Sequence, residues 1–169
     1  MRKNVLMVLW IVMSVACVTM PAPRQIQNEW AIDRPFDSVW QATLEMLAEM
    51  NLSLIEPIQK ESGLISTELA NFPENQKACW DCGKLAFTQF SQGHRGKITV
   101  FVKKIDEAQT GLKIVANFEI LFTDSTDESL TKRRLERAVQ AGDNLFKRPC
   151  VSTRKWEADF YARVQAKLK

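Results

Sequence analysis

GLKIVANFEILF, residues 111–122, decides the fold, because apolar and polar side chains alternate along it. Alternation with a period of two places one set of side chains on a buried sheet face and the other set toward solvent. The preceding run KITVFVKKI, residues 97–105, is rich in β-branched residues, and polar residues 106–111 separate the two runs. We therefore predict a long antiparallel hairpin. The expected inner face of its second strand carries Leu112, Ile114, Ala116, Phe118, Ile120 and Phe122, and the other face carries Lys113, Asn117 and Glu119.

Two amphipathic helices are predicted to flank this hairpin. The first is FDSVWQATLEMLAEM, residues 36–50, with Asp33 as its expected cap and Pro35 in its first turn. The second begins at about Ser152, and apolar residues recur along it at every fourth position. The apolar positions are Phe36, Val39, Trp40, Thr43, Leu44, Leu47 and Met50 in the first helix and Trp156, Phe160, Val164 and Leu168 in the second.

Shorter strands complete the predicted sheet. Residues 25–32 suit a first strand with one buried face, and residues 52–70 read as a hairpin that turns at residues 60–63. Pro57 interrupts the first arm of that hairpin and places it at an edge or a bulge. One more strand is expected at residues 85–90, within a less regular region. This order predicts an α+β fold, with an antiparallel sheet of about five to six strands and two helices packed on one face.

The first seventeen residues, MRKNVLMVLWIVMSVAC, have the order of an export signal. Arg2 and Lys3 form a positive n-region, and the apolar segment at residues 5–15 is too short to span a hydrocarbon core of roughly 30 Å comfortably. Small residues then lead into Cys17. This order resembles the lipobox of bacterial lipoproteins, which implies that residues 1–16 are removed and that Cys17 carries acyl chains such as palmitate. An ordinary secretory signal and an uncleaved anchor are the alternatives.

Composition places the remaining chain among single globular domains. The sequence has 23 basic and 20 acidic residues, so removal of Arg2 and Lys3 with the signal leaves 21 basic residues against 20 acidic ones. A nearly neutral chain of this kind is not expected to bind nucleic acid. We predict a tether over residues 17–25 and one α+β domain over residues 26–169, with a charged insert at about 124–149. The basic run in that insert, KRR, is expected to be a solvated helix face, and docking to anionic lipid is its alternative.

Few residues have the spacing that catalysis or metal binding requires. Cys79-Trp80-Asp81-Cys82 is a CxxC motif, but no apolar strand leads into it and no helical spacing follows, as a thioredoxin-like site requires. A zinc site would need His94 and Cys150 in addition, in a compartment where thiols oxidise. His94 lies between glycines in a predicted polar turn, residues 91–97, and is expected to be solvated. The acidic residues Asp124, Asp127 and Glu128 are expected to cap a following helix rather than to bind calcium.

Residues 36–68 resemble the opening of small exported lipoproteins with BamC-like (NlpB-like) helix-grip domains. In that family a VW-x-A helix precedes a hairpin with a Gly-(Leu/Ile/Val)-Ile step, and an Asp-Cys-Gly and a Cys-x-Ser-Thr step occur later in some members. The matching residues are Val39, Trp40 and Ala42, then Gly63, Leu64 and Ile65, then Asp81, Cys82 and Gly83, and last Cys150, Ser152 and Thr153. Arg154 stands where the family pattern has Gly. The resemblance implies a helix-grip-like β-α-β(n)-α order, and its motifs are structural rather than catalytic.

Three cysteines remain after Cys17, so one disulfide and one free thiol are expected in an exported chain. Chain entropy favours a bridge from Cys150 to either Cys79 or Cys82, at about 4 kcal/mol, over the short Cys79–Cys82 ring, at about 2 kcal/mol. The Asp-Cys-Gly step of the resembled lipoproteins implies that Cys82 is the residue bridged to Cys150 and that Cys79 is free. A bridge between Cys79 and Cys150 is the alternative.

The expected function is that of a lipid-anchored lipoprotein facing the periplasm, with a structural or partner-binding role in the cell envelope. Neither an enzymatic activity nor a cofactor is expected, and the partners are the membrane, through the lipid, and an unidentified envelope protein. Val18 lacks the aspartate that retains enteric-type lipoproteins in the inner membrane, and by that analogy we expect the outer membrane. The alternatives are a carrier of a small apolar ligand in a helix-grip cavity and a CxxC thiol oxidoreductase.

Overall fold

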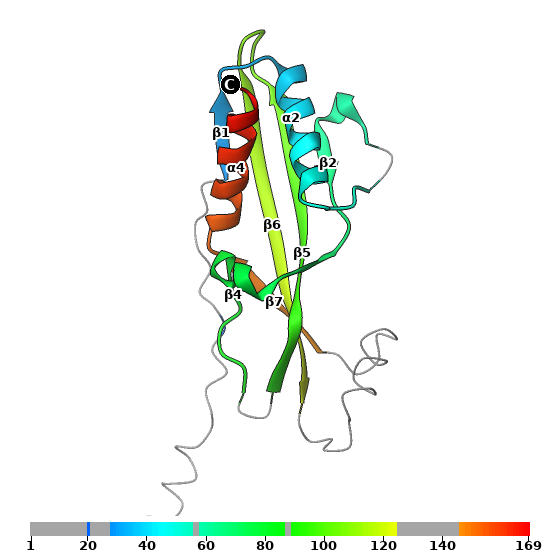
Figure 1. The fold of residues 1–169 in the computed structure, drawn as a ribbon, viewed down its shortest axis with the longest axis vertical. Helices are drawn as coiled ribbons and strands as arrows, with labels where there is room; N and C mark the ends of the chain where they lie inside the picture. The colour runs from blue at the N-terminus through cyan, green and yellow to red at the C-terminus, as the bar shows by residue number, and fades with distance from the viewer. Residues whose placement is uncertain (1–19, 21–27, 56–57, 87–88, 125–145) are drawn as a thin grey trace, which may run out of the picture.

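A computed structural model describes residues 20, 28–55, 58–86, 89–124 and 146–169 of the chain. Within these ranges the fold is α+β, as the sequence predicts, with an antiparallel sheet and two main helices (Figure 1). The elements in chain order are β1 (Glu29–Ile32), α2 (Phe36–Glu49), η1 (Lys60–Ser62), β2 (Leu64–Ser66), β3 (Ala70–Phe72), η2 (Glu74–Cys79), β4 (Trp80–Asp81), β5 (Gln89–Lys104), β6 (Thr110–Asp124), β7 (Phe146–Ser152) and α4 (Lys155–Lys167).

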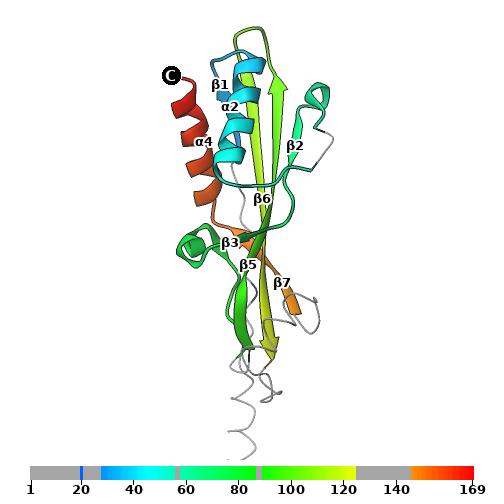
Figure 2. The same cartoon turned by 45° about the vertical axis from the view of Figure 1, so that its right-hand side comes forward.

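The long hairpin of β5 and β6 forms the middle of the sheet, and the shorter strands pair along its two outer edges. The strand order is β2-β5-β6-β7-β4, with β3 also paired to β5 and β1 also paired to β6. The register pairs Val100 with Ile114 and Ile98 with Ala116, so the alternating apolar residues of both strands share one face. Figures 1 and 2 show that the hairpin runs nearly the full length of the molecule. The alternation of residues 111–122 therefore predicts this hairpin correctly.

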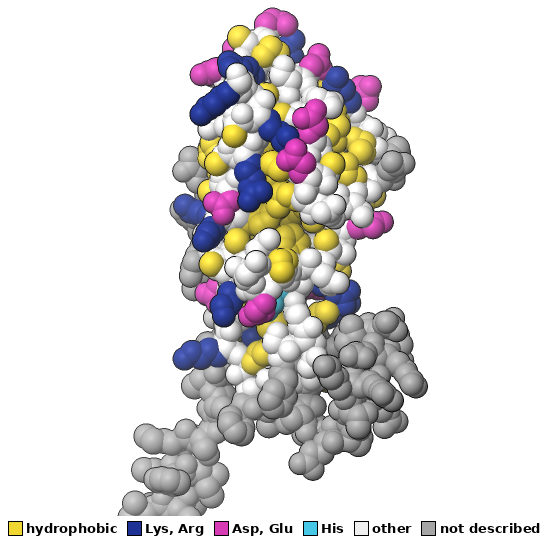
Figure 3. All heavy atoms as spheres, in the orientation of Figure 1, with side chains coloured by type: hydrophobic (Ala, Val, Ile, Leu, Met, Phe, Trp, Pro, Cys, Tyr) yellow, Lys and Arg dark blue, Asp and Glu magenta, His cyan; other side chains and the backbone are white. Residues whose placement is uncertain are grey.

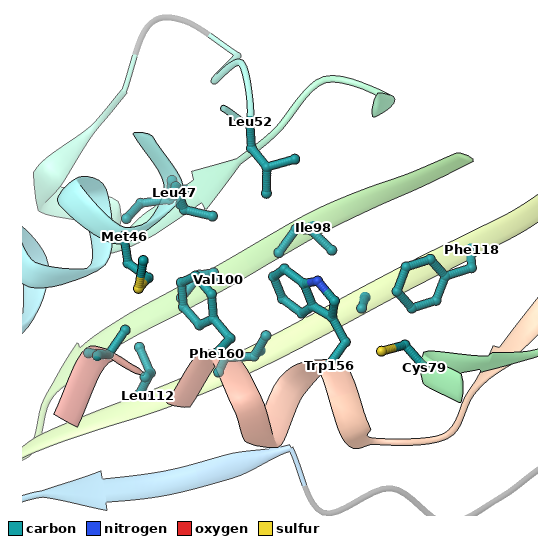
Figure 4. Close-up of a cluster of buried hydrophobic side chains, with 14 of the residues drawn as sticks. Met46, Leu47, Leu52, Cys79, Ile98, Val100, Leu112, Phe118, Trp156 and Phe160 are labelled. Atoms are coloured by element: carbon teal, nitrogen blue, oxygen red, sulfur yellow. The ribbon is translucent and has the colours of Figure 1, made fainter. Parts of the chain in front are cut away.

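Helices α2 and α4 pack on one face of the sheet, and the core lies between the two layers (Figure 2). Phe160 and Trp156 of α4 stack with ring centroids 5.1 Å apart, and they project toward the hairpin strands (Figure 4). The predicted apolar stripe of α4 is confirmed, since Trp156, Phe160 and Val164 are buried. Helix α2 buries Val39, Trp40, Ala42, Thr43, Met46 and Leu47. Leu44 and Met50, which the helical spacing also assigns to the core, are only half-buried.

Two glycines allow close approaches within this architecture. Gly63 follows η1 in a left-handed conformation with φ 64°, and a Cβ there would lie 2.0 Å from the carbonyl oxygen of Val102. Gly96 lies on the inner face of β5, where a Cβ would lie 2.8 Å from ring atoms of both Phe72 and Phe118. The predicted turn at residues 60–63 is therefore present, whereas Gly96 is a packing position inside a strand.

Several predicted boundaries are wrong. Asp33 does not cap α2, because the helix begins directly after Pro35 without a side-chain cap, and the Asp33 carboxylate instead accepts a hydrogen bond from Gln109 Nε2 at 2.8 Å. The end of the predicted charged insert is strand β7, which pairs with β6 from Phe118 to Phe122. Within the described residues the sheet has seven strands, where the sequence predicts about five to six. Strands β3, β4 and β7 are short or polar segments without clear alternation, so the sequence does not mark each of them. The helix predicted within the insert lies outside the described residues.

Candidate functional site

The two faces of the sheet differ in what covers them. Even-numbered residues of the hairpin face the helices, and odd-numbered residues 95–103 of β5 and 111–119 of β6 point the other way. We call this second side the open face, because in the described part of the chain α2 and α4 both lie on the opposite side (Figure 2). Strands β1 and β2 extend the open face, since Glu29 pairs with Lys113 and Leu64 pairs with Phe101.

Large apolar side chains stand exposed near one end of the open face. Phe101 and Leu64 are each 40% exposed, and Ile105 is 52% exposed. Beside Phe101 and Ile105 is a depression of about 760 Å³, which these two residues line together with Lys103, Lys104, Lys113 and Glu29. Gly111 also lines this depression, and a Cβ at that position would lie 3.5 Å from Ile105 Cδ1. A second hollow of about 440 Å³ shares Phe101, Lys103 and Lys104 with the first.

The basic side chains on and next to the open face fall into two groups, those that form an ion pair with a described residue and those that do not. Lys113 forms an ion pair with Glu29, and Lys104, at the end of β5, forms one with Glu107 at 2.6 Å. Arg95, Lys97 and Lys103 all lie on the open side of β5, and none of them forms an ion pair or a side-chain hydrogen bond with any residue that the structure describes. Lys97 and Lys103 are exposed, whereas Arg95 is half-buried and lies directly across from Glu119 of β6. As far as the described residues show, the open face therefore combines exposed apolar groups with basic groups that form no ion pair, a combination that suits an anionic or amphiphilic surface better than a small neutral ligand.

The cysteines lie at the junction of β4, β7 and α4. Cys82 and Cys150 form a disulfide with their Cα atoms 4.1 Å apart, which is the pairing that the resemblance implies. Cys79 is a free, buried thiol beside Trp156 (Figure 4). Burial, and to a lesser degree the nearby Asp159 carboxylate, raises the pKa of this thiol. A raised pKa disfavours the thiolate, which is the reactive form, so this environment does not activate Cys79.

His94 is not the solvated turn residue that the sequence predicts. It lies within β5, 9% exposed, and its ring packs against Trp80 with centroids 5.0 Å apart. Its Nδ1 lies 3.4 Å from Glu74 Oε2, on a carboxylate that is largely exposed. Burial lowers the pKa of the imidazole, and Glu74 opposes this shift more weakly. The neutral ring is therefore favoured at neutral pH, and His94 acts as a packing residue of the inner face.

Glu157 is a buried charged residue that the sequence reasoning missed. It is 1% exposed in the first turn of α4, and its Oε2 accepts a hydrogen bond from the Ser152 hydroxyl at 2.7 Å. Burial raises the pKa of the carboxyl group, although this hydrogen bond favours the charged form. Neither Ser152 nor Thr153 caps α4, because Arg154 is the N-cap residue, with φ 74° and without a side-chain cap. Thr153 instead donates its hydroxyl proton to the Ala78 carbonyl at 2.6 Å.

Other predicted site residues fall largely outside the described ranges. Cys17, Asp127, Glu128 and the KRR run are not among the described residues, and Asp124 is the last residue of β6. Among the residues that are described, no three His, Cys, Asp or Glu side chains gather in a way that could hold a metal ion. The candidate sites therefore reduce to the open face, the disulfide junction and the helical face.

The helical face carries charges of both signs around an apolar strip (Figure 3). A small hollow of about 220 Å³ lies between α2, η2 and α4, and Met50, Cys79, Trp156 and Phe160 contribute to its lining. Behind it the aromatic rings of Phe72, Trp80, Phe118, Trp156 and Phe160 contact one another in the core. The space between sheet and helices is thus occupied by large side chains where these rings meet.

Comparisons with known proteins identify no family for this chain. No protein-family model matches the chain, and no curated protein is significantly similar to it. None of the helices in the described ranges has both the length and the apolar composition that crossing a bilayer requires.

Proposed function

We propose that this protein is a lipid-anchored lipoprotein of the cell envelope, held by Cys17 at the periplasmic face of the outer membrane, and that its domain binds a partner through its surface. The observation that carries the proposal is the order of the N-terminal sequence: two basic residues, a short apolar segment, small residues and Cys17. The short apolar segment is a poor membrane span, so an acyl anchor is the more economical explanation of the cysteine.

The disulfide supports an exported location. Structural disulfides persist in oxidising compartments and are rare in the cytosol. The bridge between Cys82 and Cys150 joins the segment after β4 to the middle of β7, where only two residue pairs hold β4 to the sheet. A covalent link at such a weakly paired strand is useful only where it stays oxidised, which agrees with a periplasm-facing domain.

The packing of the domain supports a surface role over catalysis or ligand carriage. Two buried titratable groups have structural contacts: Glu157 accepts a hydrogen bond from Ser152, and His94 packs on Trp80. The free thiol of Cys79 has a raised pKa, which opposes redox chemistry. Aromatic side chains meet between the helices and the sheet, where a carrier would hold its ligand. The exposed apolar and basic groups gather instead on the open face.

Intact-mass analysis of protein extracted from membranes tests the anchor. We expect a mature chain that begins at Cys17 with the added mass of acyl groups, and a Cys17→Ala variant that lacks this mass and no longer fractionates with membranes as mature protein. Thr19→Ala, two residues further on, is the matched control and should be acylated normally. A mature chain that starts elsewhere, or an unmodified Cys17, would refute the proposal.

A further inference from the structure

We propose that the open face of the sheet docks onto an anionic phospholipid surface, with Phe101 and its neighbours against the lipid and the unpaired basic residues of β5 among the headgroups. This inference rests on the proposed function, because the acyl anchor is what keeps the domain at the membrane. It goes further by naming the surface that faces the bilayer and the chemistry that holds it there.

The charge of the open face supports this orientation. Arg95, Lys97 and Lys103 project from the same side of one strand, and at about 3.3 Å per residue they extend over roughly 26 Å. Lys97 and Lys103 are exposed and form no ion pair with the described residues, so their charges are available to an external anion, whereas Arg95 is half-buried directly across from Glu119. On the helical face, by contrast, Lys167 contacts both Glu45 and Glu49, and acidic and basic groups intermingle (Figure 3).

Apolar side chains lie between these charges, which favours lipid over a purely ionic ligand. Phe101 stands between Lys97 and Lys103 along β5, and Leu64 lies directly across from it on β2. Both are 40% exposed although they belong to the sheet. Exposed apolar groups that are flanked by basic residues are the pattern that places a protein surface at the boundary between headgroups and acyl chains.

The route of the chain brings the open face near the anchor. Glu29 is the first residue of β1, and it also lines the depression beside Phe101. Residues 18–28 alone separate it from Cys17, and fully extended they reach at most about 40 Å. Tethering raises the effective concentration of lipid at this face, so a contact too weak to recruit the free protein is sufficient to orient the anchored one.

Vesicle binding of the complete mature chain with Cys17→Ala isolates the docking surface from the anchor. We expect this chain to cosediment with phosphatidylcholine vesicles that contain phosphatidylglycerol, and not with phosphatidylcholine vesicles alone. Binding should weaken between about 0.1 M and about 0.5 M salt, since screening shortens the reach of the charges. Substitution of Lys97→Gln together with Lys103→Gln should weaken partitioning about 25-fold, because each basic side chain contributes about a factor of five at an anionic surface.

A matched variant controls for net charge. Lys155→Gln with Arg163→Gln removes two exposed charges from α4 on the opposite layer and should leave binding within about twofold of the parent, since those residues face away from the lipid. Phe101→Thr should weaken binding while the salt dependence is retained.

Three results would overturn the inference. The first is equal loss of binding in the α4 and β5 variants, and the second is no preference for anionic vesicles. The third is a concentration-dependent dimer that the β5 substitutions abolish, because the open face would then be a contact between two copies. A Cys17 that is not acylated would remove the proposed anchor without changing these binding results, so the two proposals fail separately.

Discussion

Removing the Cys82–Cys150 bridge should cost this domain a large part of its stability. The bridge closes a loop with a sequence separation of 68 residues, and the chain-entropy relation for a loop of that length gives about 4 kcal/mol at 25 °C. Domains of this size typically unfold with a free energy of about 5–15 kcal/mol. The Cys82→Ala, Cys150→Ala double variant should therefore retain about 1–11 kcal/mol of stability, with β4 held by two residue pairs to β7.

Urea unfolding with and without a reductant measures this contribution. With m of about 1–3 kcal/mol per molar, a loss of about 4 kcal/mol lowers the midpoint by roughly 2 M. Reductant should bring the parent protein to the midpoint of the double variant and should leave the variant itself unchanged, because Cys79 is already a free thiol. A difference below about 1 kcal/mol between oxidised and reduced parent would refute the loop-entropy reasoning.

Three further substitutions probe local features. Burial raises the pKa of Glu157, so the folded state binds its proton more tightly than the unfolded state, and the resulting stability is present at acidic pH and is lost as pH rises through the folded pKa. In unfolding curves measured over a series of pH values, the free energy of unfolding of Glu157→Gln should therefore increase relative to that of the parent as pH rises through the folded pKa. A difference that stays constant with pH would contradict this. Gly63→Ala should destabilise by at least about 1–2 kcal/mol in thermal unfolding, because φ is positive and the Cβ would overlap the Val102 carbonyl, whereas Gly111→Ala should be tolerated. Arg154→Gly should stabilise by about 0.5–1 kcal/mol in urea, since Arg154 adopts a left-handed conformation, and a loss of stability would show that its charge matters more.

The elements with a strong period are the ones that sequence alone predicts. Alternation along residues 111–122 identifies β6 and its inner face, and the four-residue spacing from Trp156 to Val164 identifies the buried side of α4. Strand β7 has no such signal, because its sequence FKRPCVS contains a proline and adjacent basic residues. Its position is set by pairing with β6 and by the disulfide, which are interactions with distant parts of the chain.

The candidate site was only partly visible in the sequence. Gly93 and Gly96 suggest a turn around His94, yet Gly93 lies at a bulge and Gly96 makes room for two aromatic rings, so β5 begins much earlier than expected. Because the predicted strand began at residue 97, Arg95 could not be placed on one face with Lys97 and Phe101. The signal that could have found the open face is the recurrence of basic residues at odd positions on both sides of that phenylalanine.

The pairing of β1 with β6 also fixes an order of folding. The contact between Glu29 and Lys113 joins residues 84 positions apart, whereas β5 and β6 are neighbours in the chain and share the longest ladder in the sheet. Pairings between near neighbours close with less loss of chain entropy and form faster than distant ones. Among the described strands β6 is the pairing partner of β1, so β1 can enter the sheet only after β6 has formed. Entry of the N-terminal strand into the sheet is thus expected to be a late step of folding, which follows formation of the central hairpin.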